Sequence, residues 1–154
     1  VITAESVFYP TSGQELFTNG TEKRAYAGKH SVTLGEAALL YEATLLNMPE
    51  EKLNEEMDRR LSVMEDSVAL GLSLDSPPMF MLQPTAKKIM EAEASGKLAM
   101  GGLHTRVAAR ALAAMQVNSG QGIICAAPTG GSAGVLASIV VTMLEDMKLF
   151  LIHI

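Results

Sequence analysis

The sequence predicts an all-α fold of about five helices, packed as a single helical domain with a glycine-rich loop between the last two helices. Two observations support this prediction. Apolar residues recur at helical spacing through most of the chain after residue 30. The strand candidate, residues 122–126, has no clear second strand with which it could pair. Because 48% of the residues are hydrophobic but only 5% are aromatic, the core must consist of aliphatic side chains and methionine.

The first 30 residues show no sustained hydrophobic period and contain proline and glycine. We therefore expect residues 1–30 to form an irregular arm or linker, with at most one short element near residues 12–17. Residues 31–154 would then form the helical domain.

Regular structure is expected to begin with a helix that ends at Leu46, because Thr33 and Glu36 have the spacing of a capping box. Pro49 then opens a long helix, and Gly71 and the turn at residues 76–78 end it. The apolar positions of this helix are spaced four, four, three and four residues apart, which is one helical stripe. The stripe consists of Leu53, Met57, Leu61, Met64 and Val68.

Two shorter helices are expected next. Thr85 can cap a helix over residues 86–94, which Gly96 would close. An alanine-rich helix follows over residues 103–117, and its small side chains would let a neighbouring helix come close.

After the loop, Thr129 or Ser132 can start the last helix, which covers residues 133 to about 148. Its residues are apolar almost all round, so we expect this helix to be buried on most sides.

Composition argues against several classes of function. A net charge of −5, without a cluster of lysine and arginine, argues against a nucleic-acid partner and against an anionic membrane surface. The longest apolar stretch, residues 133–144, is too short to span a bilayer. A single cysteine, and no signal peptide in residues 1–9, indicate a cytoplasmic protein.

The loop within residues 118–136 is the strongest candidate for a functional site. Backbone N–H groups of Gly130 and Gly131, at the positive end of the last helix, could hold a carboxylate or a phosphate. Thr129 and Ser132 would add hydroxyl groups. The alternative interpretation is a tight corner in which glycine and alanine let two helices touch.

Other reactive residue types are better explained by structure than by chemistry. Cys125 lies in an apolar run and is expected to act as a small buried hydrophobe. The three histidines have no metal-binding spacing, and His104 is expected at the surface rather than in a cavity. Arg106 and Arg110 share a helix face and could bind a carboxylate, but a solvated face is the preferred interpretation.

Residues 117–136, which read Val-Asn-Ser-Gly-Gln-Gly and later Pro-Thr-Gly-Gly-Ser-Ala-Gly, resemble a family signature. The signature is that of the α chain of iron–sulphur-dependent L-serine dehydratase, roughly Val-Asn-Ala-x-Met-Gly and then Pro-Thr-Ala-Gly-Ser-Ala-Gly. Residues 57–65 are similar to the family's long N-terminal helix, and the turn at residues 96–98 falls in the expected order. The resemblance covers about residues 31–148.

This resemblance implies an all-helical catalytic domain of a lyase that degrades L-serine to pyruvate and ammonia, a step that can feed gluconeogenesis. It also implies a [4Fe–4S] cluster that acts as a Lewis acid, and a homo-oligomeric enzyme. Six residues of the loop would line the pocket for L-serine or a similar small amino acid. They are Asn118, Ser119, Thr129, Gly130, Gly131 and Ser132.

Three departures from the family pattern matter. The family's cluster cysteines lie in Gly-Cys-Gln and Cys-Asp-Pro stretches beyond residue 154, and this chain has only Cys125. Residues 79–84 replace a Gly-Leu-x-Gly-Gly-Asp stretch, and Gly120-Gln121 replaces a pair of a small residue and methionine. We therefore expect no metal on this chain alone. It would be inactive without the remainder of the catalytic chain or a second subunit.

Two alternatives stay open. The apolar residues 149–154 and 79–82 favour a non-catalytic helical interaction module derived from the same scaffold. The loop motif alone also permits a fragment of a related enzyme that degrades cysteine.

Overall fold

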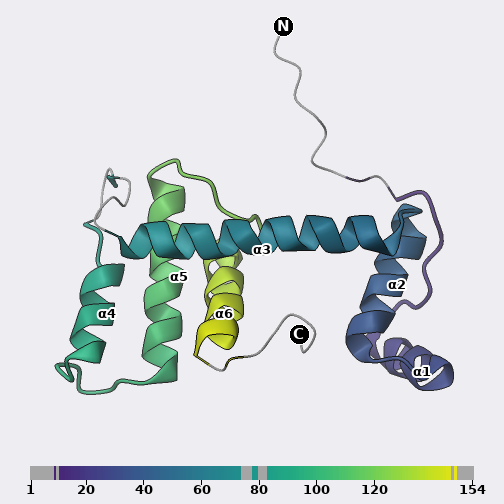
Figure 1. The fold of residues 1–154 in the computed structure, drawn as a ribbon, viewed down its shortest axis with the longest axis horizontal. Helices are drawn as coiled ribbons and strands as arrows, with labels where there is room; N and C mark the ends of the chain where they lie inside the picture. Colours follow the sequence, from purple (N-terminus) through teal and green to yellow (C-terminus); the bar gives the residue numbers. More distant parts are fainter. Residues whose placement is uncertain (1–8, 10, 74–77, 80–82, 147, 149–154) are drawn as a thin grey trace, which may run out of the picture. The chain divides into compact units, whose positions relative to one another are not determined.

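The computed structural model describes residues 9, 11–73, 78–79, 83–146 and 148. These residues contain six helices and no strand, so the all-α prediction is confirmed, whereas the expected helix count was too low (Figure 1). Residues 122–126 are not a strand. The helices are α1 (Gly20–His30), α2 (Leu34–Leu46), α3 (Glu50–Leu72), α4 (Ala86–Ala94), α5 (Leu103–Ser119) and α6 (Ser132–Glu145).

Helix α1 lies where an irregular arm was predicted, so that prediction is wrong for residues 20–30. The helix has no apolar stripe to reveal it, and only Ala27 is buried. It starts at a cap instead: the Asn19 side chain accepts a hydrogen bond from the Glu22 amide at 3.0 Å. The Glu22 carboxylate in turn accepts the Thr18 amide at 2.7 Å, and this bond lowers the pKa of Glu22. An Asn-x-x-Glu spacing is the sequence signal for this helix.

The chain divides into two compact units, residues 1–57 and 58–154, and α3 contributes to both. In the first unit the predicted capping box of α2 is confirmed, with Thr33 and Glu36 bonded reciprocally. Phe17 packs against Tyr41 and Tyr26, with ring centroids 4.7 and 5.7 Å apart. The predicted division into residues 1–30 and 31–154 stays a prediction.

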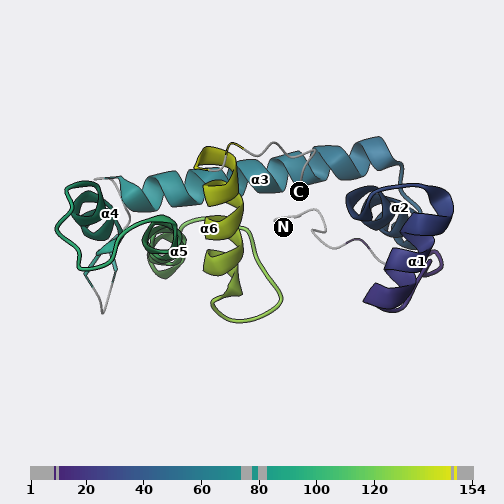
Figure 2. The ribbon, with the colours of Figure 1, turned by 90° about the horizontal axis from the view of Figure 1, so that it is seen from below.

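In the second unit, α3 crosses α5 and α6, while α4 lies beside α5 (Figures 1 and 2). The backbones of α3 and α5 touch, because a Cβ atom on Gly71 would lie 2.2 Å from the Ala113 carbonyl oxygen. Helices α5 and α6 are similarly close at Gly134. The prediction that the small side chains of α5 let neighbouring helices come close is therefore confirmed. The core cluster consists of Met64, Val68, Ala114, Ala137 and Val141.

Helix α4 covers the predicted residues, but its cap differs from the prediction. The Thr85 side chain forms no capping hydrogen bond. The buried Gln116 side chain of α5 takes that role: its Oε1 accepts the amides of Thr85 and Ala86 at 2.8 and 2.9 Å. Its Nε2 donates to the Gly71 carbonyl at 3.1 Å. One side chain therefore ties the end of α3 and the start of α4 to α5.

Helix α6 begins at Ser132 with Gly131 as its N-cap residue, and no side chain caps it. The prediction that it is buried on most sides is wrong for one face, where Val135, Leu136 and Ile139 are 51%, 42% and 43% exposed. Among the described residues, no helix has both the length and the apolar character needed to cross a membrane.

Candidate functional site

The predicted site residues lie at the two ends of the loop that joins α5 to α6. Asn118 and Ser119 are the exposed last residues of α5. Thr129, Gly130 and Gly131 are exposed just before α6, and the half-buried Ser132 is its first residue. Within the described ranges no hydrogen bond joins the two groups. That all six residues contact one ligand stays a prediction.

The chain leaves α5 through a tight reversal. The Gly122 amide donates to the Val117 carbonyl at 2.8 Å, and the Gln121 amide donates to the Asn118 carbonyl at 3.0 Å. The backbone of Gln121 adopts the left-handed conformation, with φ of 63°. A Cβ atom on Gly122 would lie 2.5 Å from Val117 Cγ1, so only glycine fits there without a shift of the valine. The reversal therefore fixes the path by which the loop leaves the exposed end of α5.

The chain enters α6 through a second turn, which is held by Ser132. The Ser132 hydroxyl accepts the Thr129 amide at 3.1 Å and donates to the Thr129 carbonyl at 2.5 Å. The Ser132 amide also donates to that carbonyl, at 3.1 Å. Gly131 adopts φ of 82°, a conformation that glycine reaches without strain. The Ser132 hydroxyl is thus committed to the turn.

Two backbone donors at this turn have no partner in the part of the chain that the structure describes. These are the amides of Gly130 and Gly131, and neither donates to an acceptor there. They lie at the N-terminus of α6, where unpaired N–H groups and the helix dipole favour an anion. The Thr129 side chain is exposed beside them. Chemically, this end of the loop suits a carboxylate.

The positions of Cys125 and His104 agree with the structural interpretation. Cys125 is partly buried and packs against the core cluster. His104 is exposed in the first turn of α5, and the ring of His30 lies 4.3 Å from that of Tyr26. His153 lies outside the described residues. Among those described, no three or more histidine, cysteine, aspartate or glutamate residues are grouped to hold a metal ion.

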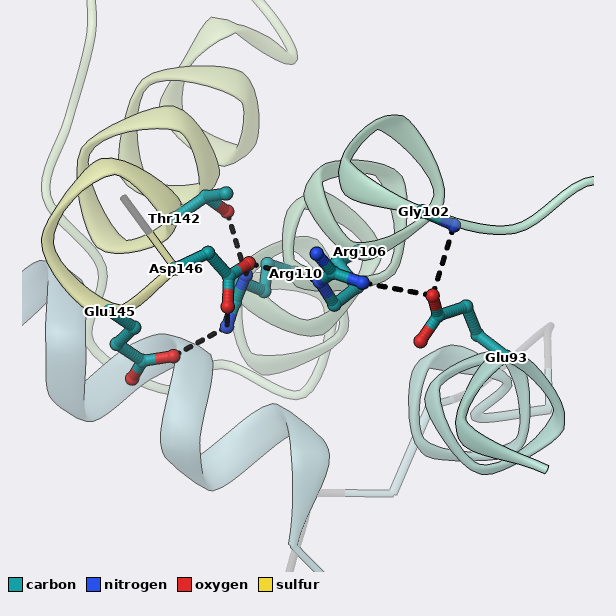
Figure 3. A network of polar contacts seen from close by, with 7 residues as sticks. All are labelled: Glu93, Gly102, Arg106, Arg110, Thr142, Glu145 and Asp146. Atoms are coloured by element: carbon teal, nitrogen blue, oxygen red, sulfur yellow. Dashed lines mark hydrogen bonds and ion pairs between the residues drawn. The ribbon is translucent and has the colours of Figure 1, made fainter. Parts of the chain in front are cut away.

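The two arginines of α5 form ion pairs between helices, so the prediction of a solvated face is wrong (Figure 3). Arg110 is 4% exposed and donates to Thr142, Asp146 and Glu145 of the α6 end, at 2.9, 2.8 and 2.5 Å. Arg106 bridges Asp146 at 3.0 Å and Glu93 of α4 at 2.9 Å. Glu93 also accepts a hydrogen bond from the Gly102 amide. We call this network the arginine clamp; it consists of Glu93, Gly102, Arg106, Arg110, Thr142, Glu145 and Asp146.

The charged groups of the arginine clamp pair with one another, although the buried Nε of Arg110 donates to no acceptor among the described residues. Burial acts to lower the pKa of Arg110, but the hydrogen bond to Asp146 and the charges of Glu145 and Asp146 outweigh it and raise that pKa. The hydrogen bond from Arg110 lowers the pKa of Asp146. Both arginines are therefore occupied by carboxylates of the protein itself. The clamp is a structural link and not a carboxylate-binding site.

Local spacing did not reveal the acidic partners of the clamp. Glu145 and Asp146 lie 35 and 36 residues from Arg110. A pair of acids at a helix C-terminus is unfavourable for the helix dipole, and this was the available signal that cations lie nearby.

Comparison with known proteins gives one consistent result. The family model described as "Serine dehydratase alpha chain" matches residues 15–154. A "Probable L-serine dehydratase, alpha chain" of Bacillus subtilis (strain 168) is 29% identical over 133 residues, which cover 86% of this chain and 44% of the relative. An "L-serine dehydratase, alpha chain" of Peptoniphilus asaccharolyticus is 31% identical over 97 residues, which cover 62% of this chain and 33% of the relative.

No solved structure matches the chain. The matched regions span less than half the length of the two curated relatives. The comparisons therefore concern part of an alpha chain.

Proposed function

Because this chain belongs to the serine dehydratase alpha chain family, we propose that it forms part of an L-serine dehydratase-type lyase, which converts L-serine to pyruvate and ammonia. The observation that carries this proposal is the family match over residues 15–154, which includes the whole α5–α6 loop. The activity implies a role in amino-acid degradation in the cytoplasm. A homo-oligomer is part of the same proposal.

The loop forms one wall of the serine pocket. The amides of Gly130 and Gly131 donate to the substrate carboxylate, because they lack an acceptor in the described chain and lie at the positive end of α6. Thr129 adds a hydroxyl beside them, while Ser132 keeps the turn in shape through its bonds to Thr129. Asn118 and Ser119, exposed at the end of α5, contribute side chains from the opposite end of the loop.

The residues of this chain do not fit the [4Fe–4S] cluster of the family. Such clusters are held by several cysteine thiolates, and this chain has one cysteine, packed against its core. When bound in a complete enzyme, the cluster supplies a Lewis acid. Its ligands would belong to the part of the alpha chain without a counterpart here. This chain alone is therefore inactive.

Thermal denaturation with L-serine tests the substrate proposal. At ten times the Kd, a ligand that binds only the folded chain adds about 1.4 kcal/mol. For a chain of this size that raises Tm by about 3–6 °C. Gly130→Ala keeps the amide but adds a methyl group to the open space from which the substrate carboxylate would approach, so it should abolish the shift. It should not change the Tm of the free protein, because a Cβ atom there meets nothing within 4 Å.

Gly28→Ala is the matched control, since its Cβ would also point into open space but far along the sequence from the loop. It should leave the serine-induced shift intact. An unchanged Tm of the wild-type chain at saturating serine would contradict the proposal.

Anaerobic reconstitution with iron and sulphide tests whether the chain is incomplete. The expected result is no retained iron after desalting and no pyruvate formed from L-serine. One cluster per chain together with serine turnover would show that the proposed incompleteness is wrong.

A helical interaction module remains the second candidate function. The exposed apolar face of α6 supports it. Residues 80–82 and 149–154, whose apolar composition also favours it, lie outside the described residues. A serine-induced rise in Tm favours the lyase part. A chain that self-associates without responding to serine favours the module.

A further inference from the structure

We propose that the exposed face of α6 formed by Val135, Leu136 and Ile139, here called the α6 face, is a docking surface for the rest of a serine dehydratase alpha chain. This inference deepens the proposed partner of the chain. It depends on the family and on the packing of α6, and not on whether serine binds the loop.

Helical geometry places the α6 face away from the core. Ala137 and Val141 of α6 pack in the core cluster with Met64 and Val68 of α3. An α-helix turns about 100° per residue, so Ile139 lies about 200° around α6 from both Ala137 and Val141. Val135 has the same relation to Ala137. The side chains of Val135 and Ile139 therefore point away from the core cluster and from α3.

The α6 face also lacks the charges that normally cover an exposed helix surface. No charged residue occurs between Ser132 and Leu144. By contrast, the exposed side of α4 carries Lys87 and Glu91, which pair at 4.0 Å. A helix that is apolar all round is normally buried, and an exposed apolar patch usually marks an interaction site. The α6 face therefore lacks a cover that its composition requires.

The relatives indicate what this cover is. More than half of each curated alpha chain has no counterpart in this chain, because the matches span 44% and 33% of their lengths. In those proteins this family region is accompanied by that additional polypeptide. A segment of the same alpha chain can bury an apolar helix face as part of one hydrophobic core. We assign the α6 face to this occupant rather than to a second copy of the chain.

Co-expression tests the assignment. The tagged chain would be produced with the unmatched remainder of the Bacillus subtilis alpha chain, fused to maltose-binding protein to keep it soluble. Wild-type chain should retain the fused remainder on affinity purification, and maltose-binding protein alone should not be retained. Leu136→Lys should lower retention at least tenfold, and the double variant Leu136→Lys/Ile139→Lys should abolish it.

Leu70→Lys is the matched control, because Leu70 is also a helical leucine of the second unit and is 37% exposed, against 42% for Leu136. It should retain the remainder as the wild type does. Circular dichroism must show equal helix content in all variants, which is expected because the changed side chains are already exposed.

Two results would overturn the assignment. One is a soluble remainder that wild-type chain does not retain, or that the double variant retains equally well. The other is a wild-type chain that sediments as a dimer while the double variant sediments as a monomer, because a second copy would then be the occupant. Neither result depends on serine, so a failure of docking is distinguishable from a failure of the proposed substrate.

Discussion

The two ends of the α5–α6 pair differ in how their polar groups are satisfied. At the C-terminal end of α6, the arginine clamp pairs Arg106 and Arg110 with Asp146, Glu145 and Glu93. At the N-terminal end of α6, the amides of Gly130 and Gly131 have no acceptor in the described chain. One end of the pair is thus closed by the protein's own charges, and the other offers donors to a ligand.

The difference separates the residues that stabilise the helix pair from those available for binding. Both ends carry groups that could bind a carboxylate, arginine at one end and backbone amides at the other. Only the second set lacks an acceptor among the described residues. A residue type that suits a ligand therefore says little until the groups around it are known.

The largest expected effect comes from breaking the closed end. Arg110→Met leaves Asp146 and Glu145 without their buried partner and should lower the free energy of unfolding by about 2–4 kcal/mol. Most of this loss should come from Asp146, because Glu145 is mostly exposed. Urea denaturation measures this change. The exposed Arg24→Met is the control and should stay within about 0.5 kcal/mol of the wild type. A neutral effect of Arg110→Met would mean that the clamp does not stabilise the second unit.

Alanine substitutions at Gly71 and Gly130 compare a closely packed position with one at the open end of the α5–α6 pair. Gly71→Ala should destabilise the chain by about 1–3 kcal/mol, because its Cβ would lie 2.2 Å from the Ala113 carbonyl oxygen and the helix backbones must separate. Gly130→Ala, at the open end, should change stability by less than about 0.5 kcal/mol. Chemical denaturation of both variants checks the order, and equal effects would contradict the close packing of α3 on α5.

The pH dependence of stability is expected to show a smaller effect of the clamp. The pKa of Asp146 is lowered in the folded chain, so its contribution is present above its unfolded pKa and is lost as pH falls through the folded pKa. Asp146→Asn should therefore lower Tm at pH 7, and the difference from wild type should shrink as pH falls below about 4. Asp66→Asn is the control on an exposed helix surface. A difference that grows on acidification would contradict this sign.

Much of the helical framework could be predicted from local signals. The capping box of Thr33 and the extent of α4 are examples, since both depend on residues close in sequence. Helix α1 was missed because its start depends on the Asn19 cap and not on an apolar stripe. The Gln116 cap of α4 could not be predicted, because Gln116 lies 31 residues from Thr85.

The position of the candidate site stays a prediction, and its local geometry could not be predicted from the sequence. The glycine and hydroxyl residues indicated the loop, and the family match now includes it. The spacing of Thr129 and Ser132 did not show that the Ser132 hydroxyl is used within the turn. The exposure of the α6 face was also unexpected, because an apolar composition predicts burial without showing which part of the protein provides it.

The central claim is that the open end of the α5–α6 pair binds the substrate, and amide NMR during a titration with L-serine tests it most directly. The proposal predicts saturable chemical-shift changes at Gly130 and Gly131, with the amides of Arg106 and Arg110 unchanged. No saturable change at the two glycines, or changes confined to the clamp, would contradict it.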